Sequence, residues 1–189
     1  MNIVGIAGSL RKGSYNRLLL KNAQSLLPEG VSLEIADLDD IPFFSEDVEA
    51  LGDPPAVEWL KSLVRSADAL LIATPEYNAG IPGVLKNALD WLSRGDPSAL
   101  FGKPVAVVGA SPSRFGTARA QMSLLPVLVA SGAVVMSAPG VMVSEVYSKF
   151  DDEGVLEPES AAMLSQALRG LVEWASRFNT VEEPGAVAS

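Results

Sequence analysis

Two polar loops in this chain contain the residue types that proteins use to bind phosphate. The segments Gly8–Asn16 and Pro75–Gly83 each follow a short apolar run and precede a helix-like pattern. The amino end of a helix has unpaired N–H groups and a partial positive charge, which attract anions. The first loop adds a permanent positive charge at Arg11 and polar side chains at Ser9, Ser14 and Asn16. We therefore predict that the first loop binds a phosphate group.

The spacing of glycines in the first loop argues against two familiar phosphate motifs. Gly8 and Gly13 are followed by Ser14, as in a P-loop, but the lysine that belongs between the second glycine and the serine is missing, and Lys12 precedes Gly13 instead. Gly5 and Gly8 are three residues apart, so they do not begin the G-x-G-x-x-G fingerprint of dinucleotide-binding proteins. An ATPase and a Rossmann-type dehydrogenase are both disfavoured.

The composition limits the chemistry that the side chains can perform. The chain contains no cysteine and no histidine. These absences remove disulfides, thiol catalysis, imidazole bases and the common thiolate and imidazole metal ligands. A bound redox cofactor would fill this gap, because a flavin performs hydride transfer itself and needs the protein for binding, orientation and electrostatics.

The charge and hydropathy patterns restrict the partners. The chain has 14 basic and 23 acidic residues, a net charge of −9, which disfavours nucleic acid as a partner. The first apolar run, residues 2–7, is too short for a signal peptide, and the positive charges follow it rather than precede it. No run approaches the ~20 apolar residues that span a bilayer. We expect a cytoplasmic protein with no membrane partner.

Strand-like and helix-like patterns alternate along the chain. Short apolar runs predict strands at 2–7, 33–36, 69–74, 105–109 and 133–136. Helical periodicity is found near 15–27, 56–66, 83–93, 117–131 and 158–178. This alternation predicts an α/β fold, a flavodoxin-like, doubly wound, five-stranded parallel sheet of order 2-1-3-4-5 with helices on both faces. In that order the loops after the first and third strands meet at the edge where ligands bind.

We expect one domain over residues 1–179, because a chain of 189 residues is long enough for one well-filled α/β domain. Residues 180–189 are predicted to be a disordered tail. Segment 39–56 is rich in acidic residues and proline and contains Phe43 and Phe44. A mobile lid or a dimer contact is possible there, but an irregular connection with two buried aromatic side chains is the favoured interpretation.

The two loops, taken together, resemble those of the NADPH-dependent FMN reductase family, which includes chromate, quinone and azo-dye reductases. Three stretches carry the resemblance, which extends from residue 2 to about 178: Gly8–Arg17, Pro75–Trp91 and Arg119–Gln121. The first two are specific in this order and separation, whereas either alone is weak. The resemblance implies a flavodoxin-like fold with non-covalently bound FMN, and NADPH or NADH as the electron donor.

The resemblance also implies which residues bind the cofactor. Residues of the first loop match the family's phosphate loop, namely Ser9, Arg11, Ser14, Tyr15 and Asn16. Residues of the second loop match the segment along the ribityl chain and the flavin ring, namely Pro75, Glu76, Tyr77, Asn78 and Gly80. Ser111 matches the third loop. We expect the Glu76 carboxylate to be solvated, and no side chain to act as a catalytic acid or base.

This chain departs from the family pattern in two places. Many relatives have a glycine-rich third loop, whereas segment 111–116 contains Pro112, Arg114 and Phe115. Arg114 is a hypothetical attractor for the anionic nucleotide or an anionic acceptor. Relatives also place an arginine shortly after the counterpart of Gln121, where this chain has Leu124, Leu125 and Pro126.

The resemblance implies an oxidoreductase that passes hydride from NADPH or NADH through flavin to a small acceptor such as a quinone, chromate, or an azo or nitro compound. It also implies a homodimer or a tetramer. Two alternatives remain at this stage: a flavodoxin-type electron carrier, and a flavin reductase that releases reduced FMN to a monooxygenase. A non-enzymatic nucleotide-binding module is a third alternative, supported by the fold alone.

Overall fold

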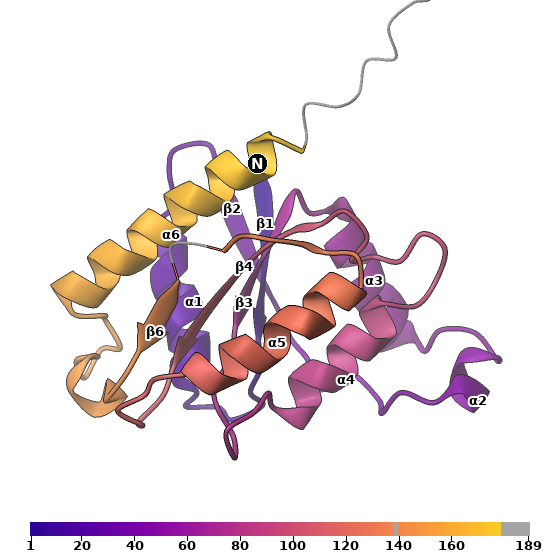
Figure 1. Ribbon diagram of the computed structural model, residues 1–189, viewed down its shortest axis with the longest axis horizontal. Helices are drawn as coiled ribbons and strands as arrows, with labels where there is room; N and C mark the ends of the chain where they lie inside the picture. Colours follow the sequence, from indigo (N-terminus) through magenta and orange to yellow (C-terminus); the bar gives the residue numbers. More distant parts are fainter. Residues whose placement is uncertain (138–139, 179–189) are drawn as a thin grey trace, which may run out of the picture.

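A parallel sheet forms the centre of the molecule (Figure 1). The computed structural model describes residues 1–137 and 140–178. The strands are β1 (Asn2–Ala7), β2 (Ser32–Ala36), β3 (Ala69–Ala73), β4 (Pro104–Ala110), β5 (Val134–Val135) and β6 (Val141–Val143). Their order is β2-β1-β3-β4-β5, with β6 also paired to β4, and every pairing is parallel. The predicted order 2-1-3-4-5 is confirmed.

Helices cover both faces of the sheet (Figure 1). They are α1 (Tyr15–Ser25), α2 (Glu46–Glu49), α3 (Pro55–Ser66), α4 (Gly83–Leu92), α5 (Ala118–Ala130) and α6 (Pro158–Ser176), with a 3-10 turn at Val146–Ser148. α1 and α6 pack on one face, and α3, α4 and α5 pack on the other. The short helix α2 stands away from the body of the molecule. Among the described residues, no helix has the length and apolar character needed to cross a membrane.

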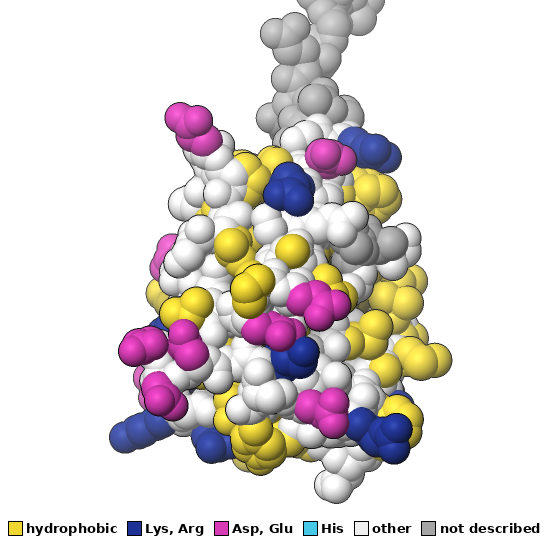
Figure 2. Space-filling model, turned by 90° about the vertical axis from the view of Figure 1, so that its left-hand side faces the viewer, with side chains coloured by type: hydrophobic (Ala, Val, Ile, Leu, Met, Phe, Trp, Pro, Cys, Tyr) yellow, Lys and Arg dark blue, Asp and Glu magenta, His cyan; other side chains and the backbone are white. Residues whose placement is uncertain are grey.

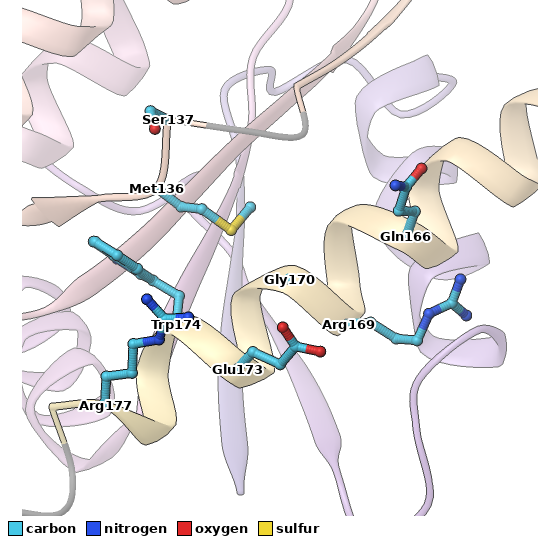
Figure 3. Close-up of a pocket in the computed structure, with 8 residues that line it drawn as sticks. All are labelled: Met136, Ser137, Gln166, Arg169, Gly170, Glu173, Trp174 and Arg177. Atoms are coloured by element: carbon cyan, nitrogen blue, oxygen red, sulfur yellow. The ribbon is translucent and has the colours of Figure 1, made fainter.

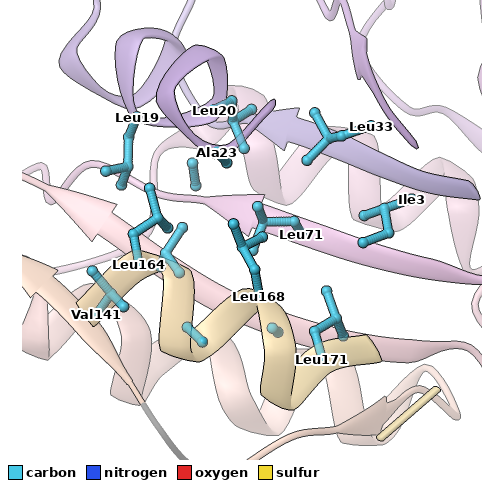
Figure 4. Close-up of a cluster of buried hydrophobic side chains, with 14 of the residues drawn as sticks. Ile3, Leu19, Leu20, Ala23, Leu33, Leu71, Val141, Leu164, Leu168 and Leu171 are labelled. Atoms are coloured by element: carbon cyan, nitrogen blue, oxygen red, sulfur yellow. The ribbon is translucent and has the colours of Figure 1, made fainter. Parts of the chain in front are cut away.

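Alternating side chains of the central strands build a separate core on each face. Ile3 and Leu71 belong to the core under α1 and α6, together with Leu19, Leu164 and Leu168 (Figure 4). The neighbouring residues in each strand, Val4 and Ile6 in β1 and Leu70 and Ile72 in β3, belong to the other core. Strands buried on both faces read as continuous apolar runs, which is why the sequence revealed them.

The fifth strand differs from the prediction, because it consists of two pieces. Val134–Val135 pairs with the start of β4, and Val141–Val143 pairs with its end. The sequence analysis missed the second piece, since a three-residue run gives too little pattern to identify a strand. The predicted tail, residues 180–189, lies outside the described residues.

Segment 39–56 also differs from the favoured interpretation. Phe44 packs edge-on against the buried Trp91, with 4.9 Å between ring centroids, but Phe43 is 85% exposed. The expectation of two buried aromatic side chains was therefore wrong for Phe43. The segment places its aromatic residues on opposite sides, one against the core and one in solvent.

Candidate functional site

Three loops meet at the carboxyl ends of β1, β3 and β4. The parallel register aligns Ala7 with Ala73 and Ala73 with Val108, so these strands end side by side. The Gly8 N–H donates to the Ala73 carbonyl at 2.9 Å, which fixes the start of the first loop beside β3. β1 and β3 are the neighbours whose connections lead in opposite directions, and this switch point is where open α/β sheets bind ligands.

The first loop presents unpaired backbone donors at the start of α1. The Ser14 hydroxyl caps the helix by accepting from the Arg17 N–H at 3.4 Å. Within the described residues, the next two helical N–H groups, of Tyr15 and Asn16, have no hydrogen-bond partner, nor do those of Lys12 and Gly13. Free N–H groups clustered at a helix amino end are the donors that phosphate binding requires.

Arg11 lies beside these donors. A Cβ built on Gly13 would stand 3.9 Å from the Arg11 Nε, so the guanidinium lies along the loop backbone. No carboxylate of the described residues forms an ion pair with it. The cation is thus available to an anion bound at the start of α1.

Asn16, a predicted binding residue, connects the first loop to β4. Its Nδ2 donates to the Ala110 carbonyl and its Oδ1 accepts from the Ala110 N–H, both at 2.9 Å. Asn16 is almost completely buried. This pair of bonds places the start of α1 against the end of β4, so the side chain positions the loop.

The second loop is a tight turn next to the first. The N–H groups of Tyr77 and Gly80 each donate to the other residue's carbonyl, at 3.1 and 3.0 Å. The two central residues, Asn78 and Ala79, have φ values of 51° and 64°, as in a type I′ turn. The hydroxyl of the half-exposed Tyr77 lies 3.2 Å from the Ser9 hydroxyl. This hydrogen bond joins the two loops.

Glu76 connects the second loop to α5. Its carboxylate accepts from the backbone N–H groups of Arg119 and Ala120 at 2.9 and 3.2 Å, and it forms an ion pair with the Arg119 guanidinium. The Glu76 side chain is only 3% exposed. The expectation of a solvated carboxylate was wrong, because Thr117, the residue before α5, makes no side-chain cap and Glu76 caps this helix from a distance.

The surroundings of Glu76 favour its ionised form. Burial raises the pKa of this carboxyl group, but hydrogen bonds from Arg119 and Ala120 and the charge of Arg119 outweigh burial and hold the pKa below its usual range. Glu76 is thus a fixed carboxylate at neutral pH that holds the second loop against α5.

The third loop follows β4 and completes the rim. Ser111 is buried, its N–H donates to the Val143 carbonyl at 2.9 Å, and its hydroxyl accepts from the Ser113 N–H at 3.2 Å. Arg114 and Arg119 flank the exposed ring of Phe115, with guanidinium carbons 6.0 and 5.5 Å from its centroid. The Glu76 carboxylate neutralises the charge of Arg119, whereas Arg114 has no ion-pair partner among the described residues.

Other predicted residues have different surroundings. Tyr15 packs against the rings of Tyr147 and Phe150, with centroids 6.0 and 5.6 Å away. Pro75, which lies in the chain between the end of β3 and Glu76, is buried. A Cβ built on Gly80 would meet only the Tyr77 carbonyl at 3.8 Å, so space is open above the turn.

Sequence reasoning missed Gly109 and Thr117, which fix the height of α5 over the sheet. A Cβ on Gly109 would overlap the Thr117 hydroxyl and the Thr74 carbonyl oxygen. Thr117 is fully buried. Two features of the sequence could have revealed these residues. A glycine next to the end of a strand marks a close approach of two backbone segments, and a threonine stands just before the following helix.

A cavity of about 410 Å³ lies far from the three loops (Figure 3). Trp174 and Met136 line it, and the Trp174 Nε1 donates to the carbonyl of Val134, which pairs with the first residue of β4. The cavity is thus beside the amino ends of the strands. Ser137 in its wall directly precedes residues 138–139, which the structure does not describe, so its outline is incomplete and no site is assigned to it.

The donor set fits the cofactor that the sequence suggested. Free N–H groups and an unpaired arginine suit a terminal phosphate, and an adjoining turn with open space and a half-exposed tyrosine suits a planar ring. This combination, at the switch point of a 2-1-3-4-5 sheet, defines a flavin-binding protein of the flavodoxin-like class.

The chain belongs to the NADPH-dependent FMN reductase family, whose sequence model matches residues 1–148. It is therefore an oxidoreductase that uses FMN and NAD(P)H. A relative in Pseudomonas aeruginosa, an NAD(P)H-dependent FMN reductase, is 48% identical over 179 residues, which cover 94% of this chain and 97% of the relative. A quinone reductase of Escherichia coli is 38% identical over 166 residues, covering 83% and 88% of the two chains.

The fold agrees with that of a solved flavoenzyme. An NAD(P)H:(acceptor) oxidoreductase from Paracoccus denitrificans superposes with a TM-score of 0.86 at 32% identity, covering 94% of this chain and 98% of that one. The resemblance predicted from the two loops is thus confirmed by the comparison of whole chains.

Proposed function

We propose that this protein transfers hydride from NADPH or NADH to a quinone through FMN held at the carboxyl ends of β1, β3 and β4. The observation that carries the proposal is the cluster of unpaired N–H groups at the start of α1, directly beside the turn at Tyr77–Gly80. Quinone as the acceptor is supported by the relatives named quinone reductases. Chromate, azo and nitro compounds are further candidates for the same open site.

When bound, FMN supplies the hydride transfer, and the residues of the chain have binding and positioning roles. We assign phosphate binding to Arg11 and to the N–H groups around Ser14. Asn16 and Glu76 hold the first and second loops in place through Ala110 and α5. The backbone of the Tyr77–Gly80 turn would border the flavin ring, where the two central N–H groups, of Asn78 and Ala79, can stabilise developing negative charge.

Replacing Arg11 with Ala is expected to raise the FMN dissociation constant by about tenfold, because a charge-assisted contact to phosphate contributes ~1.5 kcal/mol or more. The exposed Arg11 side chain carries no described ion pair, so the fold stays intact. Quenching of FMN fluorescence on titration with protein measures the constant. Lys21→Ala, which removes an exposed charge from the outer face of α1, is the matched control. An Arg11→Ala variant that binds like the wild type would disprove this assignment.

Replacing Arg114 with Ala is expected to raise the KM for NADPH by about fivefold at low salt, and less at high salt, because an exposed cation attracts an anionic nucleotide through a screened field. Arg169→Ala is the control, since this exposed arginine lies on α6 and, within the described residues, its side chain hydrogen-bonds Ser165 alone, at 2.8 Å. Steady-state rates at several salt concentrations measure the KM for NADPH of the wild type and both variants. Equal KM values for wild type and Arg114→Ala would end the proposal for Arg114.

An acceptor screen separates the proposed reductase from its alternatives. We expect protein-bound FMN to survive desalting and NADPH oxidation to rise on addition of 1,4-benzoquinone. Loss of flavin on the column, with turnover only of free FMN, would instead indicate a flavin reductase that releases its product. A protein that reduces ferricyanide after photoreduction of its flavin, but that does not oxidise NADPH or NADH, would point to an electron carrier.

We also propose that the protein works as a homodimer without a nucleic-acid partner. The face shown in Figure 2 carries acidic and basic side chains side by side rather than one continuous basic area, and the net charge is −9. An exposed apolar stripe along α5 supports self-association: Met122, Leu125 and Val129 are 75%, 44% and 61% exposed.

A further inference from the structure

The tip of the third loop displays an aromatic ring and a cation, both in solvent. The loop leads from the end of β4 to the start of α5 (Figure 1). Phe115 is 63% exposed, and the preceding residue, Arg114, is exposed as well. An aromatic side chain that stays in solvent contributes little to folding. These two residues are therefore candidates for a role in binding.

Hydrogen bonds within the loop fix the backbone that carries the two residues. The Ser111 hydroxyl accepts from the Ser113 N–H, and the Ser113 hydroxyl accepts from the Phe115 N–H, both at 3.2 Å. The Gly116 N–H donates to the Ser113 carbonyl at 3.0 Å, which closes a turn around Arg114 and Phe115. A loop that is ordered in advance loses less conformational entropy when a ligand binds.

Arg119 connects the Phe115 ring to the second loop. Its guanidinium carbon lies 5.5 Å from the ring centroid, within the range of a cation–π contact. The Arg119 Nε also donates to the Glu76 carboxylate at 2.6 Å. Glu76 directly precedes the turn at Tyr77–Gly80, which we assigned to the border of the flavin ring. The aromatic ring is thus held at the part of the rim where the acceptor has to approach the flavin.

The charge at the tip of the loop is positive, although the net charge of the chain is −9. Glu76 neutralises Arg119, but the guanidinium carbon of Arg114 lies 6.0 Å from the same ring without a carboxylate partner among the described residues. The acidic Glu145 adjoins the loop, where its N–H donates to the Ser113 carbonyl at 3.4 Å, yet within the described part of the chain it forms no ion pair with Arg114. A ring beside an uncompensated guanidinium suits a planar ligand with a negative charge.

We propose that Phe115 and Arg114 select, as the acceptor, a quinone whose planar ring carries an ionised acidic group. The Phe115 ring packs against the quinone ring, and the Arg114 guanidinium binds the ionised group through charge-assisted hydrogen bonds. The quinone gains a hydride from the reduced flavin and a proton from solvent and becomes the hydroquinone, while the flavin returns to its oxidised form. NADPH or NADH is the reductant. This inference rests on the quinone reduction of the proposed function.

Binding of redox-inert ligands to the oxidised holoenzyme tests the recognition without turnover. Naphthalene-2-sulfonate carries the charge, and naphthalene-2-sulfonamide is its neutral counterpart. Arg114→Gln is expected to raise the dissociation constant of the sulfonate about fivefold more than that of the sulfonamide at low salt, and less at high salt. Phe115→Ala should raise both constants, because the two ligands share one ring system. Isothermal titration calorimetry measures the constants. A Phe115→Ala variant with wild-type constants would overturn the role of the ring.

Reoxidation of the photochemically reduced holoenzyme connects the recognition to the reaction and omits NADPH. Stopped-flow mixing with 1,4-naphthoquinone-2-sulfonate and with 1,4-naphthoquinone gives one rate constant for each. Arg114→Gln should slow the reaction with the sulfonate about fivefold more than the reaction with the neutral quinone. Each variant is compared with the wild type on the same quinone, so the different potentials of the two quinones cancel. Arg169→Gln, at the exposed arginine of α6, is the matched control and should keep the wild-type ratio.

The outcomes separate this inference from the proposed function. A reduced wild type that neither quinone reoxidises would overturn quinone reduction, and the inference with it. A wild type that both quinones reoxidise, with a ratio of rate constants that Arg114→Gln leaves unchanged, would overturn the inference alone.

Discussion

Gly109→Ala is expected to abolish stable folding or to reduce the free energy of unfolding by more than about 3 kcal/mol. A methyl group at this position would overlap the Thr117 hydroxyl and the Thr74 carbonyl oxygen, and the Thr117 Cβ would lie 2.9 Å away. Relief requires both that α5 moves off the sheet and that the end of β3 shifts, and α5 begins beside the second and third loops. Urea denaturation followed by far-UV circular dichroism measures the loss.

Two further variants make this prediction specific. Gly83→Ala is the control, because a Cβ at Gly83 meets nothing within 4 Å at the start of α4. Gly109→Ala combined with Thr117→Ala should not recover the stability, since the Thr74 carbonyl belongs to the backbone of the neighbouring strand and cannot be removed. A Gly109→Ala protein as stable as the wild type would show that α5 is not fixed at this height.

Glu76→Ala is expected to reduce the free energy of unfolding by about 2 kcal/mol and to weaken FMN binding, because α5 loses its cap and the second loop loses its attachment. The variant leaves the N–H groups of Arg119 and Ala120 without their acceptor. Arg119 is half exposed, so its charge is hydrated rather than stranded. Glu34→Ala, at an exposed position in β2, is the control and should change neither quantity.

The pH dependence of this effect follows from the lowered pKa of Glu76. The folded state binds this proton less readily than the unfolded chain, so the stabilisation is complete above the ordinary carboxyl pKa of ~4.3 and is lost as the pH falls through the lower folded-state value. The stability difference between wild type and Glu76→Ala should therefore shrink below about pH 4.5. A difference that stays constant down to pH ~3 would contradict the role of the ionised carboxylate.

The sequence sufficed for the parts of the fold that depend on local pattern. Doubly buried strands such as β3 form continuous apolar runs, and the helices between them show regular apolar spacing. The strand order then followed from the general rules of parallel sheets. The three loops were located because parallel strands end at one edge, so their positions required no knowledge of side-chain contacts.

The remaining features depend on contacts between distant segments. Nothing near Glu76 in the sequence shows that its carboxylate caps a helix that begins more than forty residues later. The exposure of Phe43 depends on Phe44 taking the place against Trp91. Similarly, β6 is a strand only because the end of β4 offers it a partner. Such features arise from tertiary packing and are invisible to periodicity.

The most direct test of the account is an anaerobic mixture of the purified protein, FMN and NADPH, followed at the flavin absorption band near about 450 nm. We predict rapid bleaching of the band, since the chain is an FMN and NAD(P)H oxidoreductase, whose flavin site we propose at the three loops. The same experiment with Arg11→Ala should require more FMN for the same rate. Flavin that binds but stays oxidised with both NADPH and NADH would contradict the account and would favour an electron carrier.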